Sequence, residues 1–328
     1  MTHLDSKTGI TRFNQARGGL AMRSLAGGLA AIALLVAPIS AGADPTAPNR
    51  YLFASPDLKK LGFDLPPPPL APKDSDASLI DLDQVRAAQL ADGPAKAEAF
   101  DDAEAYLYEV LLPRFSTAAG RSLTITRRPI LAHMLRWLVA DVDFYKVKET
   151  VGADGTHYFR ARPFIEDSSI KPCDQSYMTV PGKPNDSDSS YPSGHAAHGY
   201  VAGLLLSTVM PDRGGTILAR GVRFGTNRII CGVHFPTDVA MGQRYARFIF
   251  SQASNEPAFK DDLACALEED LLDRTGKLPA RVADPKSGNY LTPSSGFSAK
   301  CQQLDVAYFQ EALDKARGTT LNLWPTKQ

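Results

Sequence analysis

The sequence predicts an all-α protein with a single helical bundle domain over residues 79–328. Several long segments carry apolar residues at helical spacing, as in Ile130, Leu131, Met134, Leu135 and Leu138. Alternation typical of strands is scarce. The segment 195–210, HAAHGYVAGLLLSTVM, is apolar on nearly every side, which is typical of a helix buried at the centre of a fold.

The first 43 residues have the pattern of a secretory signal peptide. Arg12, Arg17 and Arg23 precede an apolar run over 25–36, and Ala-Gly-Ala follows at 41–43. A basic region, a short apolar region and small residues at a cleavage site define such a signal. Met22 offers a second candidate start, because a complete signal follows it. After cleavage we expect a periplasmic protein with no stable membrane insertion.

Residues 44–78 are rich in proline and include LPPPPLAP at 65–72. A run of prolines fits neither a helix nor a central strand, so this segment should be an extended arm lying over the body. Residues 163–192 should be rich in loops, and the stretch 275–328 is the least typical part of the domain. Helical patterns cover 129–150, 195–210, 214–227, 236–254, 256–272 and 302–316.

Charge and cysteine content restrict the kinds of partner and site that the chain is expected to have. The chain has 36 basic and 36 acidic residues with no basic block, which excludes nucleic acid as an expected partner. Four cysteines in an exported chain predict two disulfides. Their spacing contains no C-x2-C pair, so it fits no zinc site. The cysteines are Cys173, Cys231, Cys265 and Cys301.

Three polar clusters lie in the middle of the chain: RARPF at 160–164, SYPSGHAAHG at 190–199 and NRIICGVHFPTD at 227–238. A Ser-Gly turn that opens a helix exposes backbone N–H groups at the positive end of the helix dipole, which suits an anion. Arginines add bidentate donors for its oxygens. One histidine can attack phosphorus when a carboxylate sets its tautomer, and a second can protonate the leaving oxygen. Such a site needs no metal ion.

The combined pattern RP, PSGH and R-x5-H-x3-D resembles the signature of the type 2 phosphatidic acid phosphatase and vanadium haloperoxidase superfamily. Within it, the chain is most similar to the bacterial class A nonspecific acid phosphatases. The signal peptide, the PPPP arm and the ICG-x-H sequence around the last histidine belong to the same resemblance, which covers most of residues 50–260. It implies a helical, exported phosphatase without a cofactor that hydrolyses small phosphomonoesters.

The resemblance also implies a role for each motif residue. His234 is the expected nucleophile that forms a phosphohistidine, with Asp238 holding its other ring nitrogen. His195 is the expected general acid for the leaving alcohol and then the base that activates water. The expected phosphate-binding residues are Arg162, Ser193, Gly194 and Arg228.

Two positions depart from the family pattern. The usual lysine seven residues before the RP arginine is Gly155 here, which removes a positive charge. Lys148 and Arg160 are the nearest alternatives, and we expect Arg160 to point away from Arg162 in an extended segment. The usual serine before the last arginine is Asn227, whose amide can replace a hydroxyl as donor to an oxyanion.

The motifs also predict how the cysteines pair. Cys173 follows the first motif and Cys231 lies inside the third, so a bond between them would brace a shared phosphate pocket. Cys265–Cys301 is then left by elimination. A vanadate-dependent haloperoxidase and a phosphate-binding relic with little activity remain the alternative functions. Both monomer and homo-oligomer remain open.

Overall fold

The computed structural model describes residues 50–52, 58–105, 107–149, 158–173, 189–279, 282–283, 290–291 and 296–316. The described residues all belong to one compact unit. The signal segment 1–43, Gly155 and the side chain of Lys148 lie outside this description, so the expectations for them stay predictions. The same is true of the last residues of the chain, 317–328.

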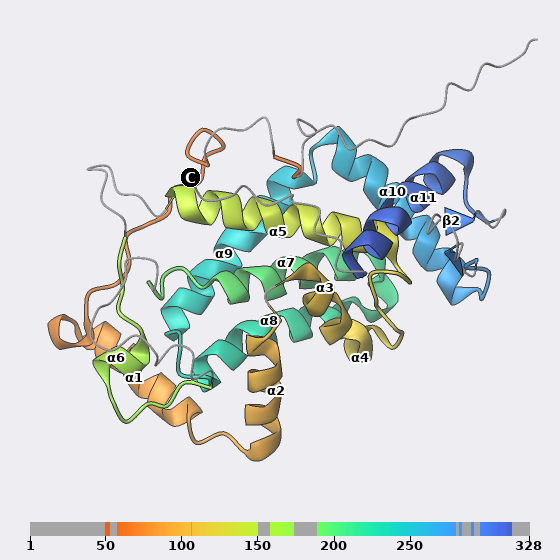
Figure 1. Cartoon of the computed structure of the whole chain (residues 1–328). Coiled ribbons are helices and arrows are strands. Elements are labelled where there is room, and N and C mark those ends of the chain that lie inside the picture. The colour runs from red at the N-terminus through yellow and green to blue at the C-terminus, as the bar shows by residue number, and fades with distance from the viewer. Residues whose placement is uncertain are drawn as a thin grey trace, which may run out of the picture. The chain divides into compact units, whose positions relative to one another are not determined.

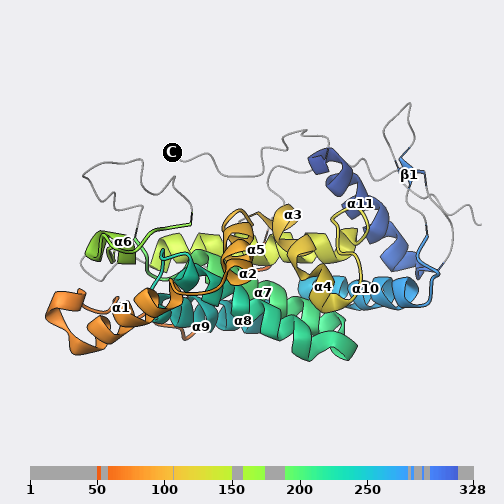
Figure 2. The same cartoon turned by 90° about the horizontal axis from the view of Figure 1, so that it is seen from below.

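Helices form nearly all of the regular structure (Figures 1 and 2), which confirms the predicted all-α class. A single pair of two-residue antiparallel strands, β1 (Val282–Ala283) and β2 (Tyr290–Leu291), accompanies them in the described residues. The α-helices are α1 Asp76–Ala88, α2 Gly93–Ala103, α3 Tyr108–Leu111, α4 Ser116–Ala119, α5 Pro129–Glu149, α6 Pro163–Glu166, α7 Gly194–Val209, α8 Gly214–Ile230, α9 Pro236–Ala253, α10 Pro257–Arg274 and α11 Ala299–Ala316. The 3-10 helices are η1 Pro72–Asp74, η2 Leu112–Phe115 and η5 Pro211–Arg213.

The helix boundaries follow from the sequence. Helices α5, α6, α9 and α10 each begin at a proline. Proline suits the first helical position, where its fixed φ is already helical and its missing N–H has no intrahelical partner to lose. The six helices expected from residue 129 onward are all present, with ends within a few residues of their expected limits.

Helix α7 is the central element, and α5, α8 and α9 pack around it (Figures 1 and 2). A Cβ atom at Gly221 would lie 2.8 Å from the carbonyl oxygen of Gly199, and one at Gly199 would lie 2.5 Å from Phe224. Glycine at both positions therefore allows α7 and α8 to approach closely. Since only η5 separates them, the two helices run antiparallel, and the start of α7 lies beside the end of α8.

The proline-rich stretch contacts the helical body at several points. Residues 63–71 form neither helix nor strand. The ring of Phe63 packs against Tyr245 and Phe248 of α9, with centroids 6.0 and 4.9 Å away. The Pro66 carbonyl accepts a hydrogen bond from the Tyr191 hydroxyl at 3.0 Å. Helical structure begins earlier than expected, because η1 and α1 start inside the 44–78 segment.

Residues 50–52 are attached to α5 through a buried carboxylate. Asp141 accepts hydrogen bonds from the backbone N–H groups of Tyr51 and Leu52, at 3.0 and 3.2 Å, and forms an ion pair with Arg50 at 3.4 Å. Burial nevertheless raises the pKa of Asp141 to about 7, because it outweighs these donors.

The C-terminal helix α11 packs against α5 and α10. The ring of Tyr308 stacks on His133 of α5 with centroids 3.6 Å apart, and His133 Nδ1 lies 3.1 Å from Glu311 Oε2. The disulfide Cys265–Cys301 joins α11 covalently to α10. Part of the 275–328 stretch is thus an integral helix of the fold. Among the described residues, no helix combines the length and apolarity that a membrane crossing requires.

Candidate active site

The three motifs meet where α7 and α9 begin and α8 ends. Arg162 of the first motif donates from Nη1 to the carbonyl oxygen of Val233 at 2.9 Å. The same nitrogen lies 3.5 Å from Nε2 of His234. Segments about 70 residues apart in the sequence are therefore side by side, as a shared phosphate site requires.

Ser193 is the N-cap of α7, and its hydroxyl accepts a hydrogen bond from the Ala196 N–H at 3.3 Å. Its own N–H donates to the backbone carbonyl of Asp238 at 3.1 Å, which joins the second motif to the third. A Cβ atom at Gly242 would lie 2.4 Å from the Ser193 carbonyl, so only glycine lets α9 approach this turn. Gly194 follows as the first helical residue, as expected for an anion site at a helix N-terminus.

His195 is held in one orientation by a backbone carbonyl of α2. Its Nε2 atom lies 3.2 Å from the carbonyl oxygen of Ala103. A carbonyl can only accept, so Nε2 carries a hydrogen and Nδ1 is the nitrogen that gains and loses the second proton. The pKa of His195 is lowered well below its usual value by burial, and further by electrostatic interactions with Arg228, His198 and His234. These three residues therefore lie within electrostatic reach of His195.

His198 lies one helical turn after His195. It is fully buried, and its Nε2 atom lies 2.8 Å from Asp143 Oδ1 of α5. It therefore joins α7 to α5 inside the protein.

The third motif begins in the last turn of α8 and ends in the first turn of α9. Arg228 is completely buried in α8. Gly232 then turns the chain with a φ of +70°, and a Cβ atom there would lie 2.6 Å from Ile170, so glycine is required on both counts. The disulfide Cys173–Cys231 closes the same turn against the segment after α6. Both predicted disulfide pairs are therefore present.

His234 is 3 % exposed, and its Nδ1 atom forms a hydrogen bond with the main chain. Nδ1 lies 2.7 Å from the carbonyl oxygen of Ser190 and 3.7 Å from Asp238 Oδ2. Nδ1 therefore carries a hydrogen, and Nε2 has the lone pair. We expected the carboxylate itself to hold this ring. The structure instead puts a backbone carbonyl in hydrogen-bonding contact, with Asp238 as a close negative charge behind it.

Asp238 is completely buried at the start of α9. Its Oδ2 atom accepts from the Phe235 N–H at 2.9 Å, and its Oδ1 atom is 2.5 Å from Arg160 Nη1. Burial raises the pKa of Asp238, while Arg160 opposes that rise.

Arg160 is a residue whose part in the site the sequence did not indicate. We expected it to point away from Arg162, and this expectation is wrong. Arg160 contacts Asp238 and Arg162 contacts His234, so both turn toward the third motif. The physical reason is that residues two apart in an extended segment share a face. Applied correctly, this two-residue periodicity would have placed Arg160 and Arg162 on the same side from the sequence alone.

Asn227 also differs from its expected role. Its Nδ2 atom donates to Oδ2 of buried Asp102 at 2.8 Å. Asp102 is paired with Arg220 by two further hydrogen bonds, at 2.6 and 2.9 Å. The asparagine thus ties α8 to the end of α2, next to the Ala103 carbonyl that orients His195.

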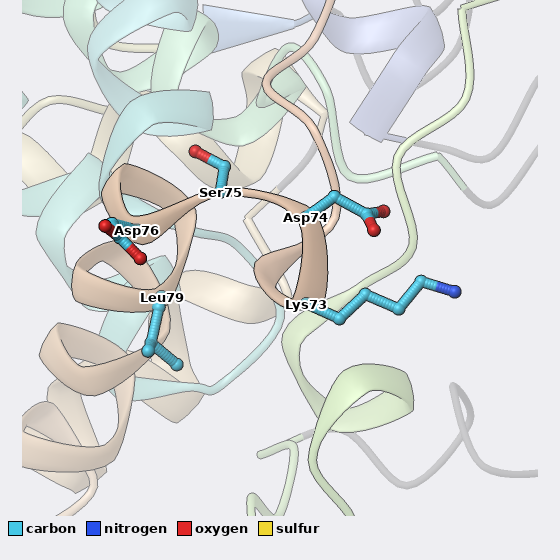
Figure 3. Close-up of a pocket in the computed structure, with 5 residues that line it drawn as sticks. All are labelled: Lys73, Asp74, Ser75, Asp76 and Leu79. Atoms are coloured by element: carbon cyan, nitrogen blue, oxygen red, sulfur yellow. The ribbon is translucent and has the colours of Figure 1, made fainter.

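The site is distinct from a surface hollow at the start of α1 (Figure 3). Lys73, Asp74, Ser75, Asp76 and Leu79 line this hollow, and their side chains point in different directions without converging on a centre. No cluster of histidine, cysteine and acidic side chains suited to a metal ion occurs among the described residues.

Comparison with known proteins agrees with this geometry. Residues 150–251, which contain all three motifs, match the PAP2 superfamily. A non-specific acid phosphatase of Salmonella typhimurium is 30% identical over 210 residues, covering 63% of this chain and 78% of the relative. One from Salmonella typhi is 29% identical over 240 residues, 72% and 90% of the two chains. An acid phosphatase of Zymomonas mobilis is 33% identical over 174 residues, 53% and 61%.

The helical fold, the three convergent motifs and these similarities define the class. The chain belongs to the PAP2 superfamily and, within it, to the class A non-specific acid phosphatases. It is accordingly an acid phosphatase, and none of these relatives carries a name that favours a haloperoxidase.

Proposed function

We propose that this acid phosphatase hydrolyses small phosphomonoesters through a phosphohistidine on His234, without a metal ion. One observation carries the proposal. The Ser190 carbonyl holds the hydrogen on Nδ1 of His234, so Nε2 carries the nucleophilic lone pair, and the Arg162 guanidinium lies 3.5 Å from that nitrogen. A nucleophile and a cation for the phosphoryl oxygens thus stand side by side.

In the first step, the Nε2 lone pair of His234 forms a bond to phosphorus as the bond to the ester oxygen breaks. The leaving oxygen takes the Nδ1 proton of His195 and departs as the alcohol. In the second step, a water oxygen bonds to phosphorus, His195 takes the water proton, and the phosphorus–nitrogen bond breaks to release phosphate. Atoms and protons balance over the two steps, and both histidines return to their starting states.

Cationic and backbone donors would bind the phosphoryl oxygens in place of a metal. Arg162 and Arg228 supply guanidinium groups, and the start of α7 at Ser193 and Gly194 supplies backbone N–H groups at the positive end of its dipole. The proposal predicts full activity after dialysis against EDTA. Inactivation that a divalent ion reverses would contradict it.

Rapid quench with ³²P-labelled substrate tests the intermediate. The wild-type enzyme should yield an acid-labile, base-stable phosphoenzyme, and His234→Ala should yield none. His133→Gln, which alters a buried histidine between α5 and α11, is the matched control and should form the intermediate normally. A labelled His234→Ala enzyme would exclude His234 as the nucleophile.

We also propose that the enzyme works in the periplasm. The pattern of residues 1–43 supports export, and two disulfides are expected in an oxidising compartment. Fractionation of cells expressing the full chain, followed by N-terminal sequencing, tests this. Periplasmic enzyme beginning at Asp44 is the expected result, and uncleaved enzyme in the cytoplasm would refute it.

A further inference from the structure

We propose that Arg160 is a positioning residue for the phosphatase reaction, which together with Asp81 of α1 holds the Asp238 carboxylate in place behind His234. The inference rests on the role proposed above for His234, and on Asp238 acting as the negative charge behind its ring. The family resemblance implies no role for either Arg160 or Asp81.

The Arg160 guanidinium makes polar contacts through both of its terminal nitrogens. Nη1 lies 2.5 Å from Asp238 Oδ1 and 2.6 Å from the Thr237 hydroxyl, and Nη2 lies 2.8 Å from Asp81 Oδ2. The group also lies over the ring of Phe235, with its central carbon 3.9 Å from the ring centroid. Arg160 is only 4 % exposed. A planar fork with several donors can make all these contacts at once, whereas a lysine ammonium cannot reproduce them.

Asp81 fixes the far side of the same group. Its Oδ1 atom accepts from the Thr237 backbone N–H at 3.2 Å, and its Oδ2 atom accepts from the Thr237 hydroxyl at 2.6 Å. A carboxylate that binds an N–H in the first turn of a helix is also favoured by the helix dipole. Through Asp81, helix α1 therefore helps to hold Asp238 in place, although Asp81 precedes Asp238 by more than 150 residues.

The charges around Asp238 explain why its contact with Arg160 matters. Asp238 must be an anion to stabilise positive charge on His234, yet burial raises its pKa. The ionisable groups that face it are Arg160, His234 and Tyr191, and Asp81 faces it across Arg160. Arg160 is the cation among them at all working pH values. Removing it would leave burial unopposed, and Asp238 would take up a proton at a higher pH.

The test measures kcat and KM for p-nitrophenyl phosphate across the acidic range. Arg160→Gln should lower kcat about 10- to 100-fold, as expected for loss of an outer positioning contact. KM should change little, because Arg160 does not touch the substrate. The acid side of the kcat profile should move to higher pH. Arg160→Lys keeps the positive charge, so the acid side of its kcat profile should lie where it does in the wild type. Its kcat should lie between the values of Arg160→Gln and the wild type.

The double variant decides whether Arg160 acts through Asp238. Arg160→Gln added to Asp238→Asn should slow the enzyme no further than Asp238→Asn alone, because the group it positions is already neutral. Losses that multiply would overturn the inference. Full activity in Asp238→Asn alone would instead refute the role proposed for Asp238, so the two failures are distinguishable.

A matched control separates positioning from general damage. Arg128 is also completely buried and forms ion pairs with Glu269, Asp270 and Asp273 of α10. Helix α10 lies at the opposite end of the unit from α1 and α6 (Figure 1). Arg128→Gln should lower thermal stability yet keep the wild-type pH profile. If Arg160→Gln does not fold, Arg160→Lys carries the test, and an unchanged kcat in that variant would overturn the inference.

Discussion

Nδ1 of His234 donates its hydrogen bond to the carbonyl oxygen of Ser190, at 2.7 Å. The tautomer of the proposed nucleophile is therefore set by the main chain. Asp238, whose Oδ2 atom lies 3.7 Å from the same nitrogen, contributes its charge and not the hydrogen bond. In a Ser-His-Asp triad one carboxylate provides both the hydrogen bond and the negative charge. Here the two come from different groups.

Asp238→Asn should therefore be milder than the corresponding change in such a triad. There the substitution alters the tautomer and costs about 10⁴-fold in kcat. Here the Ser190 carbonyl would keep the hydrogen on Nδ1, and only the lost charge should count, so we expect a fall of about 10²-fold. Steady-state kcat measures this. A loss of 10⁴-fold or more would mean that Asp238 sets the tautomer after all.

The pH profile should reflect the lowered pKa of His195. A histidine whose pKa lies below 6.5 is mostly neutral at pH 6.5, and its protonated fraction grows as the pH falls. As His195 is the proposed acid, kcat/KM should keep rising below pH 6.5. A bound phosphate dianion raises the pKa of a neighbouring histidine, so the corresponding limb of kcat should lie at higher pH than that of kcat/KM.

Profiles with p-nitrophenyl phosphate, corrected for ionisation of the substrate, test this expectation. His195→Asn should remove the limb and slow an alkyl phosphate more than p-nitrophenyl phosphate, whose good leaving group needs less acid assistance. If the limbs of kcat and kcat/KM lay at the same pH, or if kcat/KM fell just below pH 6.5, the assignment of the limb to His195 would be contradicted.

Both disulfides should stabilise the fold, but only one of them should affect activity. Their sequence separations are 58 and 36 residues, and loop-closure entropy gives about 4 kcal/mol for either. Replacing both cysteines of either pair by serine should therefore lower the melting temperature. Only loss of Cys173–Cys231 should also lower kcat/KM well below that melting temperature, because Cys231 lies in the turn between Arg228 and His234. Equal activity in the two serine variants would contradict this.

Gly155 stands where the family pattern has lysine, and the described residues do not include it. An added ammonium near the phosphoryl oxygens is worth roughly 2–4 kcal/mol by analogy with an oxyanion donor. Gly155→Lys should thus raise kcat/KM by a factor of about thirty to several hundred. Lys148→Ala is the control. If it nearly abolishes activity while Gly155→Lys brings no gain, Lys148 already serves in place of the missing lysine.

Local patterns in the sequence were enough to predict the helical class and to locate the three motifs that the fold brings together. The apolar segment 195–210 identified the central helix because burial on every side requires apolar residues on every side. Helices α5, α9 and α10 begin at Pro129, Pro236 and Pro257, for a reason confined to one residue's backbone. The residue types His195, His234, Arg162 and Arg228 pointed to phosphoryl chemistry, because few other combinations supply a nucleophile, an acid and anion donors together.

Only the tertiary structure decided which atom each of these side chains contacts. Backbone carbonyls have no sequence signature, so nothing in the chain announced that Ala103 orients His195 or that Ser190 orients His234. The ion pairs of Arg160 with Asp81 and Asp238 join residues 79 and 78 positions apart. Such contacts depend on how α1 and α9 pack together, and packing is a property of the whole folded chain.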